Sequence, residues 1–345
     1  MDRGVRWAPV VALLMAVALG VAACGGSDEQ QAAGGDESAT AAPEAKKKAV
    51  FVTDFGFNGR HSYYYVALEK GYYAEEGIDL TIERGGGSAD AIKQVAAGRA
   101  QLGFADAATL VVSRGNDDVP VKMVAAIYQN PPQAIYALKE SGISDPKDLE
   151  GKTLADAAGS AVPARFPAYA KAAGIDAGKV KWTVADSAAL PTLLGSKRVA
   201  GIGQFIVGEP LLEKAVEGKE LTRLSYADAG LDYYGNGIIA SEKILQEDPE
   251  LVRKFVRATL RGMEAAFADP VEAGAIFSKY HKEIDPDIAA GETKLVADLA
   301  KAPGGGGMGS IDPARVQSTI DVVSEAFDLE GEVAPEQVYA SGYAE

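Results

Sequence analysis

Aromatic and polar side chains are concentrated just after the apolar run Ala49–Thr53. Phe55 and Tyr64 contribute aromatic rings, and Asn58 and His61 contribute an amide and an imidazole. Aromatic rings stack on flat molecules, and amide groups hydrogen-bond to ring nitrogens and amino groups. These residue types therefore favour noncovalent binding of a flat, polar molecule.

The composition limits the other chemistry that the chain could perform. It has 345 residues, a net charge of −15, two histidines and one cysteine. So few histidines and cysteines leave little material for a zinc site or a general base, and we expect neither a metal nor a cofactor. The acidic balance does not favour nucleic acid, whose phosphates require Lys and Arg. The glycines at 85–87 precede Ser88 without the Gly-Lys-Ser ending of a nucleotide-binding loop.

The first residues of the chain have the pattern of an export signal. Two arginines precede an apolar run, 10–21, which ends in small residues directly before Cys24, the only cysteine. This order is typical of a secretory signal, and the cysteine after small residues is similar to the lipidation site of bacterial lipoproteins. A membrane-spanning helix is less favoured, because a bilayer requires roughly 20 apolar residues. An ordinary cleaved signal is the other alternative.

We therefore expect residues 1–23 to be removed and Cys24 to carry the lipid anchor. Residues 24–48 are rich in Gly, Ser, Ala, Glu and Gln and lack aromatic residues. Such a composition predicts a disordered tether.

From Ala49 onward, short apolar runs alternate with amphipathic stretches. The pattern predicts strands at 49–53, 78–82, 102–105, 121–128, 153–156, 180–184 and 199–206. It predicts helices at 63–70, 89–97, 163–173, 188–194, 249–268, 270–279 and 313–327, and one from 107. Ser88 is expected to cap the second of these helices. Strands separated by helices predict an α/β fold with largely parallel sheets.

Several motifs together resemble a known family. The segment 61–80 contains Lys70-Gly71-Tyr72-Tyr73 and ends in Glu75-Glu76-Gly77-Ile78-Asp79-Leu80. Further motifs lie at 85–88, 98–103, 209–210 and 248–255. They resemble the solute-binding proteins of ABC importers, in the branch that includes alkanesulfonate, taurine, nitrate and thiamine-pyrimidine-precursor binders. The resemblance covers about residues 49–277.

Within that branch, the segments 54–61 and 226–236 look most like the binders of thiamine pyrimidine precursors. The related yeast-type pyrimidine synthase shares the first loop, but it uses a cysteine-rich motif and consumes its own histidine. Because this chain has no cysteine besides Cys24, a synthase-like enzyme is the lesser alternative. The chain departs from the family at 197–201, where the family often has an aspartate.

The resemblance implies a type II periplasmic-binding-protein fold, which is α/β and two-lobed with a ligand cleft at the hinge. Lobe 1 would comprise 49–133 and 229–345, and lobe 2 would comprise 134–228. Ligands of such folds lie in the crevice between the lobes. The residues that the resemblance places there are Phe55, Asn58, His61, Tyr64, Ser88, Asp106, Gln129, Ser160, Glu209, Tyr234 and Asn236.

Several of these residues also have a purely structural interpretation. Phe55 and Tyr64 could be core aromatics, and His61, Asp106 or Glu209 could serve only to start a helix.

The candidate residues favour a planar N-heterocycle, such as a thiamine pyrimidine precursor, as the solute. The alternative is a small oxyanion such as an alkanesulfonate, taurine or nitrate, which requires helix N-termini, hydroxyls and Arg. Arg60 and Arg165 keep that alternative open, and a flavin is a further candidate. We expect a monomeric, lipid-anchored binding protein on the extracytoplasmic face, which delivers a solute to an ABC permease and is not an enzyme.

Replacing Cys24 by serine is expected to release the protein from the membrane. The substitution removes the thiol that would carry the lipid, and two or three acyl chains are needed for stable anchoring. The measurement is fractionation of a bacterial host that expresses either protein. An unchanged membrane-bound share of Cys24→Ser would contradict lipidation at this site.

Overall fold

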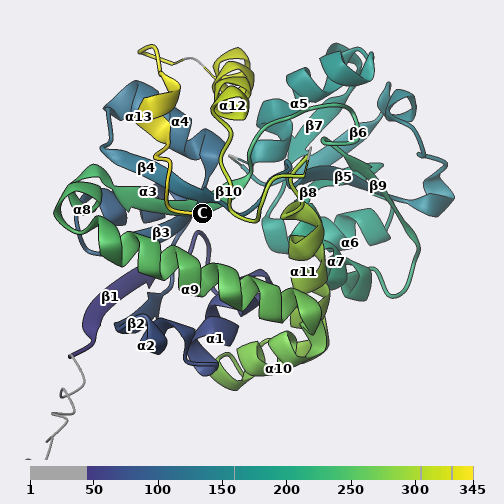
Figure 1. Cartoon of the computed structure of the whole chain (residues 1–345). Coiled ribbons are helices and arrows are strands. Elements are labelled where there is room, and N and C mark those ends of the chain that lie inside the picture. Colours follow the sequence, from purple (N-terminus) through teal and green to yellow (C-terminus); the bar gives the residue numbers. More distant parts are fainter. Residues whose placement is uncertain (1–44, 159, 304, 328, 345) are drawn as a thin grey trace, which may run out of the picture. The chain divides into compact units, whose positions relative to one another are not determined.

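The computed structural model describes residues 45–158, 160–303, 305–327 and 329–344, and it contains two five-stranded sheets (Figure 1). The predicted signal, Cys24 and most of the predicted tether lie outside these residues. The first sheet has the order β2 (Ile78–Glu83), β1 (Lys47–Val52), β3 (Leu102–Asp106), β10 (Asn236–Ser241) and β4 (Val121–Ala126). The second has the order β7 (Lys181–Val184), β6 (Thr153–Asp156), β8 (Gly201–Phe205), β5 (Gln133–Leu138) and β9 (Leu221–Ser225).

The sheets are mixed rather than largely parallel. The strand β10 runs antiparallel to β3 and β4, and β5 runs antiparallel to β8 and β9. The chain passes from the first sheet to the second through 127–132, between β4 and β5. It returns through 226–235 to add β10 to the first sheet. Both antiparallel strands therefore lie next to the two connections between the sheets.

The first strand begins inside the segment predicted as tether. Lys47 pairs with Ile78 in the parallel register of β1 and β2, and its N–H donates to the carbonyl oxygen of Gly77. The Lys47 ammonium also pairs with Asp248. Lys47 and Lys48, which the sequence placed in the tether, therefore belong to the sheet, because backbone pairing with β2 extends the strand.

Helices cover both faces of each sheet. Their bounds are α1 (Ser62–Glu69), α2 (Tyr72–Glu75), α3 (Ser88–Ala96), α4 (Ala107–Asp117), α5 (Ala161–Ala173), α6 (Leu190–Gly195), α7 (Glu209–Ala215), α8 (Glu242–Glu247), α9 (Pro249–Ala268), α10 (Pro270–Tyr280), α11 (Pro286–Leu299), α12 (Pro313–Ala326) and α13 (Pro335–Val338). On the first sheet, α1 and α9 pack on one face and α3, α4 and α12 on the other. On the second sheet, α5 covers one face and α6 and α7 the other.

The helix starts follow from short polar side chains at the strand ends. Asp106 accepts a hydrogen bond from the N–H of Thr109 at the start of α4, and Ser160 accepts one from Val162 at the start of α5. The expected cap at Ser88 is wrong by one residue, because Gly87 is the N-cap and Ser88 is the first helical residue. Strand ends and helix starts therefore coincide at the edges where the two sheets are joined.

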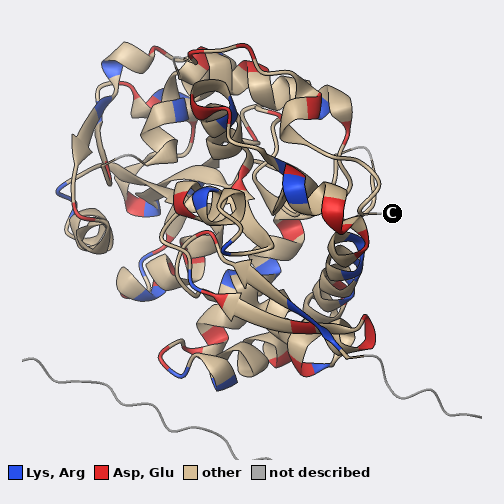
Figure 2. Cartoon of the chain, turned by 90° about the vertical axis from the view of Figure 1, so that its left-hand side faces the viewer, with Lys and Arg blue, Asp and Glu red and all other residues tan. Residues whose placement is uncertain are grey.

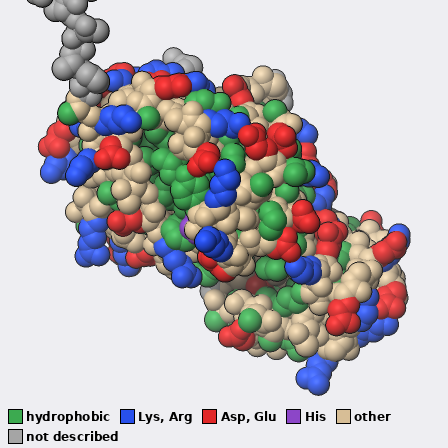
Figure 3. Space-filling model, turned by 90° about the horizontal axis from the view of Figure 1, so that it is seen from below, with side chains coloured by type: hydrophobic (Ala, Val, Ile, Leu, Met, Phe, Trp, Pro, Cys, Tyr) green, Lys and Arg blue, Asp and Glu red, His purple; other side chains and the backbone are tan. Residues whose placement is uncertain are grey.

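The helix α9 lies close against α1, which follows the first loop. A Cβ atom at Gly262 would lie 2.5 Å from the carbonyl oxygen of Tyr63 and 2.6 Å from the Cβ atom of Ala67. On the same side of the first sheet, α10 exposes Val271 and Tyr280, and hydrophobic side chains gather on the underside of the molecule (Figure 3).

Charged residues of both signs are interspersed along the helices (Figure 2). Arg257 and Arg261 on α9 pair with Glu76 and Glu75 near α2, at 2.7 and 2.8 Å. Within the part of the chain that the structure describes, no helix combines the length and apolarity that a membrane crossing would require.

Replacing Gly262 by alanine is expected to lower the free energy of unfolding by about 1 to 3 kcal/mol, because overpacking forces α9 away from α1. Helix propensity alone would give the opposite sign, a gain of about 1 kcal/mol. Urea unfolding measures the difference. The control is Gly195→Ala at the end of α6, where an added Cβ meets nothing within 4 Å. Equal or greater stability of Gly262→Ala would contradict the close packing.

Candidate functional site

A buried carboxylate at the end of β1 organises the first loop. Asp54 is 3% exposed, and its Oδ1 atom accepts hydrogen bonds from Arg60 Nη2 and His61 Nε2, both at 2.9 Å. Its Oδ2 atom accepts one from Asn236 Nδ2 of β10, also at 2.9 Å. This single side chain therefore connects the first strand, the start of α1 and the strand that returns from the second sheet.

The protonation states of this group follow from its contacts. Burial alone would raise the pKa of Asp54, but the Arg60 guanidinium and the bond from His61 hold it below its ordinary value. Burial lowers the pKa of His61, although Asp54 opposes the shift. His61 Nδ1 accepts from the N–H of Asn58 at 3.3 Å, so its Nε2–H donates to Asp54. At neutral pH the group therefore holds an anion, a cation and a neutral imidazole.

A second buried pair links the two sheets. Asp106 ends β3 directly opposite Asn236 of β10, and its Oδ1 atom accepts a hydrogen bond from Arg165 Nη2 at 2.8 Å. Arg165 comes from α5 on the second sheet and is 2% exposed. Burial alone would lower the pKa of Arg165, but Asp106 raises it above the ordinary value. Arg165 therefore stays charged, and its guanidinium forms a buried salt bridge with Asp106.

The contacts of Arg165 continue into the second sheet. Its guanidinium carbon lies 5.5 Å from the ring centroid of Tyr233, and the Tyr233 hydroxyl donates to Gln133 Oε1 at 2.8 Å. Gln133 is the first residue of β5 and is fully buried. We call the connected set the buried polar network; it comprises Asp54, Arg60, His61, Asn236, Asp106, Arg165, Tyr233 and Gln133.

This network keeps several polar atoms without a hydrogen-bond partner among the described residues. They are Arg60 Nε, Asp106 Oδ2, Gln133 Nε2, Arg165 Nε, Arg165 Nη1 and Asn236 Oδ1. A buried polar atom left unpaired costs roughly 1–3 kcal/mol, and such atoms are few in folded proteins. Their concentration where the chain joins the two sheets marks this region as the candidate ligand site.

Three of the residues predicted from the sequence belong to the network: His61, Asp106 and Asn236. Ser88 is next to it, because its hydroxyl oxygen accepts a hydrogen bond from the N–H of Asp106 at 3.1 Å. Ser160 donates to Asp156 Oδ2 at 2.8 Å, close to the start of the helix that carries Arg165.

Phe55 and Asn58 lie on the first loop beside the network. Phe55 is 62% exposed, and its backbone N–H donates to Asp54 Oδ1 at 2.8 Å. Asn58 Nδ2 donates to the carbonyl oxygen of Phe55 at 2.7 Å. The amide of Asn58 thus shapes the loop, while the ring of Phe55 is free to contact a solute.

Tyr64 lies in the core, so its ring is not exposed beside Phe55 in this structure. Its side chain is fully buried, and its ring centroid lies 4.3 Å from that of Phe51 and 4.2 Å from that of Tyr63. Tyr64 packs against Phe51 of the first sheet and Phe255 of α9. Its position on α1 therefore directs the ring into the core.

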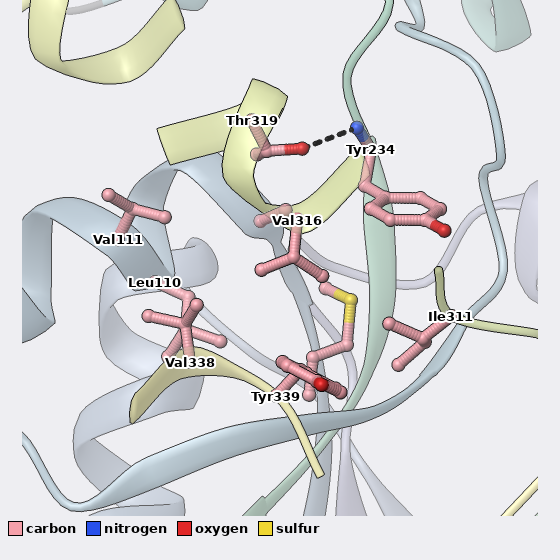
Figure 4. Close-up of a pocket in the computed structure, with 10 residues that line it drawn as sticks. Leu110, Val111, Tyr234, Ile311, Val316, Thr319, Val338 and Tyr339 are labelled. Carbon is pink, nitrogen blue, oxygen red and sulfur yellow. Dashed lines mark hydrogen bonds between the residues drawn. The ribbon is translucent and has the colours of Figure 1, made fainter. Parts of the chain in front are cut away.

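Gln129 and Tyr234 brace the connections between the sheets. Gln129 Nε2 donates to the carbonyl oxygens of Ala126 and Ser310, and Arg315 donates to both Gln129 oxygens. The Tyr234 hydroxyl accepts from the N–H of Asp312 at 2.8 Å. Its ring borders a small apolar cavity of about 20 Å³ between β4, α4, α12 and α13 (Figure 4). The polar groups of Gln129 and Tyr234 are therefore occupied within the protein.

Glu209 lies on the other face of the second sheet from Gln133. Its Oε2 atom accepts from the Tyr136 hydroxyl at 2.6 Å and from Arg223 Nη1 at 2.8 Å. Tyr136 and Gln133 are three residues apart on β5, so their side chains point to opposite faces. In this structure Glu209 does not reach the buried polar network.

Sequence reasoning missed Asp54, Gln133 and Tyr233 as site residues, and it considered Arg60 and Arg165 only as anion ligands. Asp54 had a detectable signal, because a carboxylate directly after a buried strand lies at the strand's C-terminal end, where ligands of α/β folds bind. The others depend on contacts between distant segments, such as Arg165 with Asp106.

The fold is that of the periplasmic binding proteins. The alkanesulfonate-binding protein SsuA from Xanthomonas axonopodis pv. citri, solved with bound MOPS, is similar with a TM-score of 0.64. The match covers 86% of this chain and 100% of that chain at 12% sequence identity, so it supports the fold alone. Residues 58–273 match the family model described as NMT1/THI5 like, and the chain belongs to that family.

Sequence relatives include proteins named as binding proteins and as enzymes. The riboflavin-binding protein RibY of Chloroflexus aurantiacus is 34% identical over 61% of this chain, and the match spans 60% of its own length, less than two thirds. The formylaminopyrimidine-binding protein of Halalkalibacterium halodurans is 28% identical over 67% of this chain and 69% of its own. The 4-amino-5-hydroxymethyl-2-methylpyrimidine phosphate synthase THI5 of Saccharomyces cerevisiae is 24% identical over 70% of this chain and 74% of its own.

The end of the first loop is held by a second carboxyl group with a perturbed pKa. Glu292 of α11 is 6% exposed, and its Oε2 atom accepts from the N–H of Arg60 at 2.9 Å. Burial raises the pKa of Glu292 to about 7. The folded state therefore binds this proton more tightly than the unfolded state, whose value is near 4.5, and stability falls as the pH rises from about 4.5 to about 7.

Glu292→Gln is expected to remove this part of the pH dependence, because a neutral amide oxygen can still accept from Arg60. Relative to the unmodified chain, the variant should gain on the order of 1 to 3 kcal/mol between pH 5 and pH 7.5. Urea unfolding at both pH values measures the gain. The control is Glu264→Gln on the exposed side of α9. The same pH slope in Glu292→Gln and the unmodified chain would contradict the role of Glu292.

Proposed function

We propose that the chain is the extracytoplasmic solute-binding component of an ABC importer and that its solute is a neutral, planar N-heterocycle. A thiamine pyrimidine precursor or a flavin is a solute of this kind. The solute would lie between two lobes, 49–133 with 229–345 and 134–228, and the lobes would close on it. The lipid anchor at Cys24, the permease partner and the monomeric state belong to the same proposal.

The observation that carries this proposal is the charge balance of the buried polar network. Arg60 pairs with Asp54 and Arg165 pairs with Asp106, each pair at hydrogen-bond distance and almost fully buried. Burying a charge is costly unless it is paired. A neutral solute preserves this balance, whereas an oxyanion would add a negative charge beside two carboxylates. The network therefore favours the heterocycle over a sulfonate or nitrate.

The relatives support the same class of solute, because two of them are named for binding riboflavin and formylaminopyrimidine. Phe55 supplies an exposed ring for stacking at the first loop. A flat solute could therefore stack on Phe55 in the first loop, where the sequence also predicts aromatic contacts.

An enzyme of the synthase type is the second candidate function, because relatives of that name match the chain. The geometry of His61 disfavours it. Both ring nitrogens of His61 are engaged, by the N–H of Asn58 and by Asp54, and the side chain is fully buried. A general base must reach a substrate proton. We therefore propose binding without turnover.

The test is calorimetric titration of the chain without residues 1–23 and with Cys24→Ser. The solutes are a formylaminopyrimidine, riboflavin, taurine and nitrate. One of the heterocycles is expected to bind and to raise the melting temperature. At a ligand concentration of a hundred times Kd, binding adds about 2.7 kcal/mol to the free energy of unfolding. Tight binding of taurine or nitrate without any response to the heterocycles would contradict the proposal.

Phe55→Ala is expected to weaken heterocycle binding by about tenfold, because a stacked ring contributes about 0.5–1.5 kcal/mol beyond its burial. The matched control is Val271→Ala on α10, whose side chain is similarly exposed at 65%. Equal affinities of the two variants would show that Phe55 does not contact the solute.

A further inference from the structure

The unpaired atoms of the buried polar network form a pattern of donors and acceptors. Arg165 Nε, Arg165 Nη1 and Gln133 Nε2 are donors without a partner among the described residues, and Asp106 Oδ2 and Asn236 Oδ1 are acceptors without one. The four side chains are each at least nine-tenths buried. They come from β3, β10, α5 and β5, so a molecule that satisfies them contacts elements of both sheets.

Contacts within the network bring these atoms into one region. Arg165 is bonded to Asp106, and Asn236 lies opposite Asp106 in the register of β3 and β10. On the other side, Arg165 lies over the ring of Tyr233, whose hydroxyl is bonded to Gln133. An unpaired acceptor on Asp106 therefore lies in the same side-chain pair as two unpaired donors on Arg165.

We propose that this region recognises a lactam or imide edge of the solute, –C(=O)–NH–. Asp106 Oδ2 accepts the ring N–H, and Arg165 donates to the adjacent carbonyl oxygen. Gln133 Nε2 supplies the donor for a second carbonyl when the edge is an imide. This inference rests on the proposed function and names the chemical class of its solute.

Other edges satisfy fewer of these atoms. A carbonyl oxygen has two lone pairs and can take two donors, whereas the ring nitrogen of a 4-aminopyrimidine has one. An oxyanion offers only acceptors, so it would place lone pairs against Asp106 Oδ2 and Asn236 Oδ1. The excess of donors, together with an acceptor beside them, therefore favours an edge in which carbonyl oxygens flank an N–H.

The test compares two probes that differ at one position. Lumiflavin carries an imide N–H, and 3-methyllumiflavin replaces that hydrogen by a methyl group. The unmodified binding domain, as the Cys24→Ser chain without residues 1–23, is expected to bind lumiflavin at least tenfold more tightly than its methylated form. Asp106→Asn is expected to lower the affinity for lumiflavin and to abolish the difference in affinity between the two probes, because the side chain presents an N–H in place of the acceptor.

Asparagine is also a good N-cap, so Asp106→Asn retains the start of α4. The matched control is Asp312→Asn, which alters the N-cap of α12 and is expected to leave both affinities unchanged. Circular dichroism and the melting temperature report on folding. Arg165→Lys is the second variant. It keeps the positive charge but loses the planar donors, so it is also expected to lower the affinity for lumiflavin.

Equal affinities for the two probes, or a methylation penalty that persists in Asp106→Asn, would overturn the inference. If a formylaminopyrimidine binds and lumiflavin does not, the assignment of an imide edge is wrong while the proposed binding of a neutral heterocycle stands. If neither heterocycle binds, both proposals fail.

Discussion

The structure depends on the pairing of two buried carboxylates with two buried guanidinium groups. Asp54 holds Arg60 at the first loop, and Asp106 holds Arg165 across the sheets. Removing one partner of such a pair typically costs 3–5 kcal/mol, because a buried charge is left alone. The same pairing decides the chemistry of the region, since cations that are already neutralised favour a neutral solute. Stability and selectivity therefore arise from the same contacts.

These pairs are positioned by close packing at some distance from them. The tight contact of α9 with α1 at Gly262 fixes the helix that follows the first loop, and Glu292 of α11 receives the N–H of Arg60. Arg315 of α12 holds Gln129 at one connection between the sheets and lies over the Tyr234 ring at the other. Segments far apart in the sequence thus fix the two connections through which a hinge motion would have to pass.

The sequence predicted the fold and most elements, because strand ends, N-caps and the proline-led helices are local signals. Three residues that it proposed for the site, His61, Asp106 and Asn236, lie in the buried polar network. The positions of the other candidates depended on tertiary contacts. Tyr64 lies in the core because the packed face of α1 is set by α9, and neighbouring tyrosines give no sign of which face that is. Gln129 is occupied by Arg315, 186 residues away, which no local pattern predicts. The lobe boundaries and the lipid anchor stay predictions.

The most direct test of the account is native mass spectrometry of the protein purified from its own host without added solute. The account predicts a co-purifying molecule whose mass and absorption identify an uncharged aromatic heterocycle, released when Asp54 or Asp106 is replaced. An oxyanion bound in its place, at one molecule per chain, would contradict the claim that the paired charges select a neutral solute.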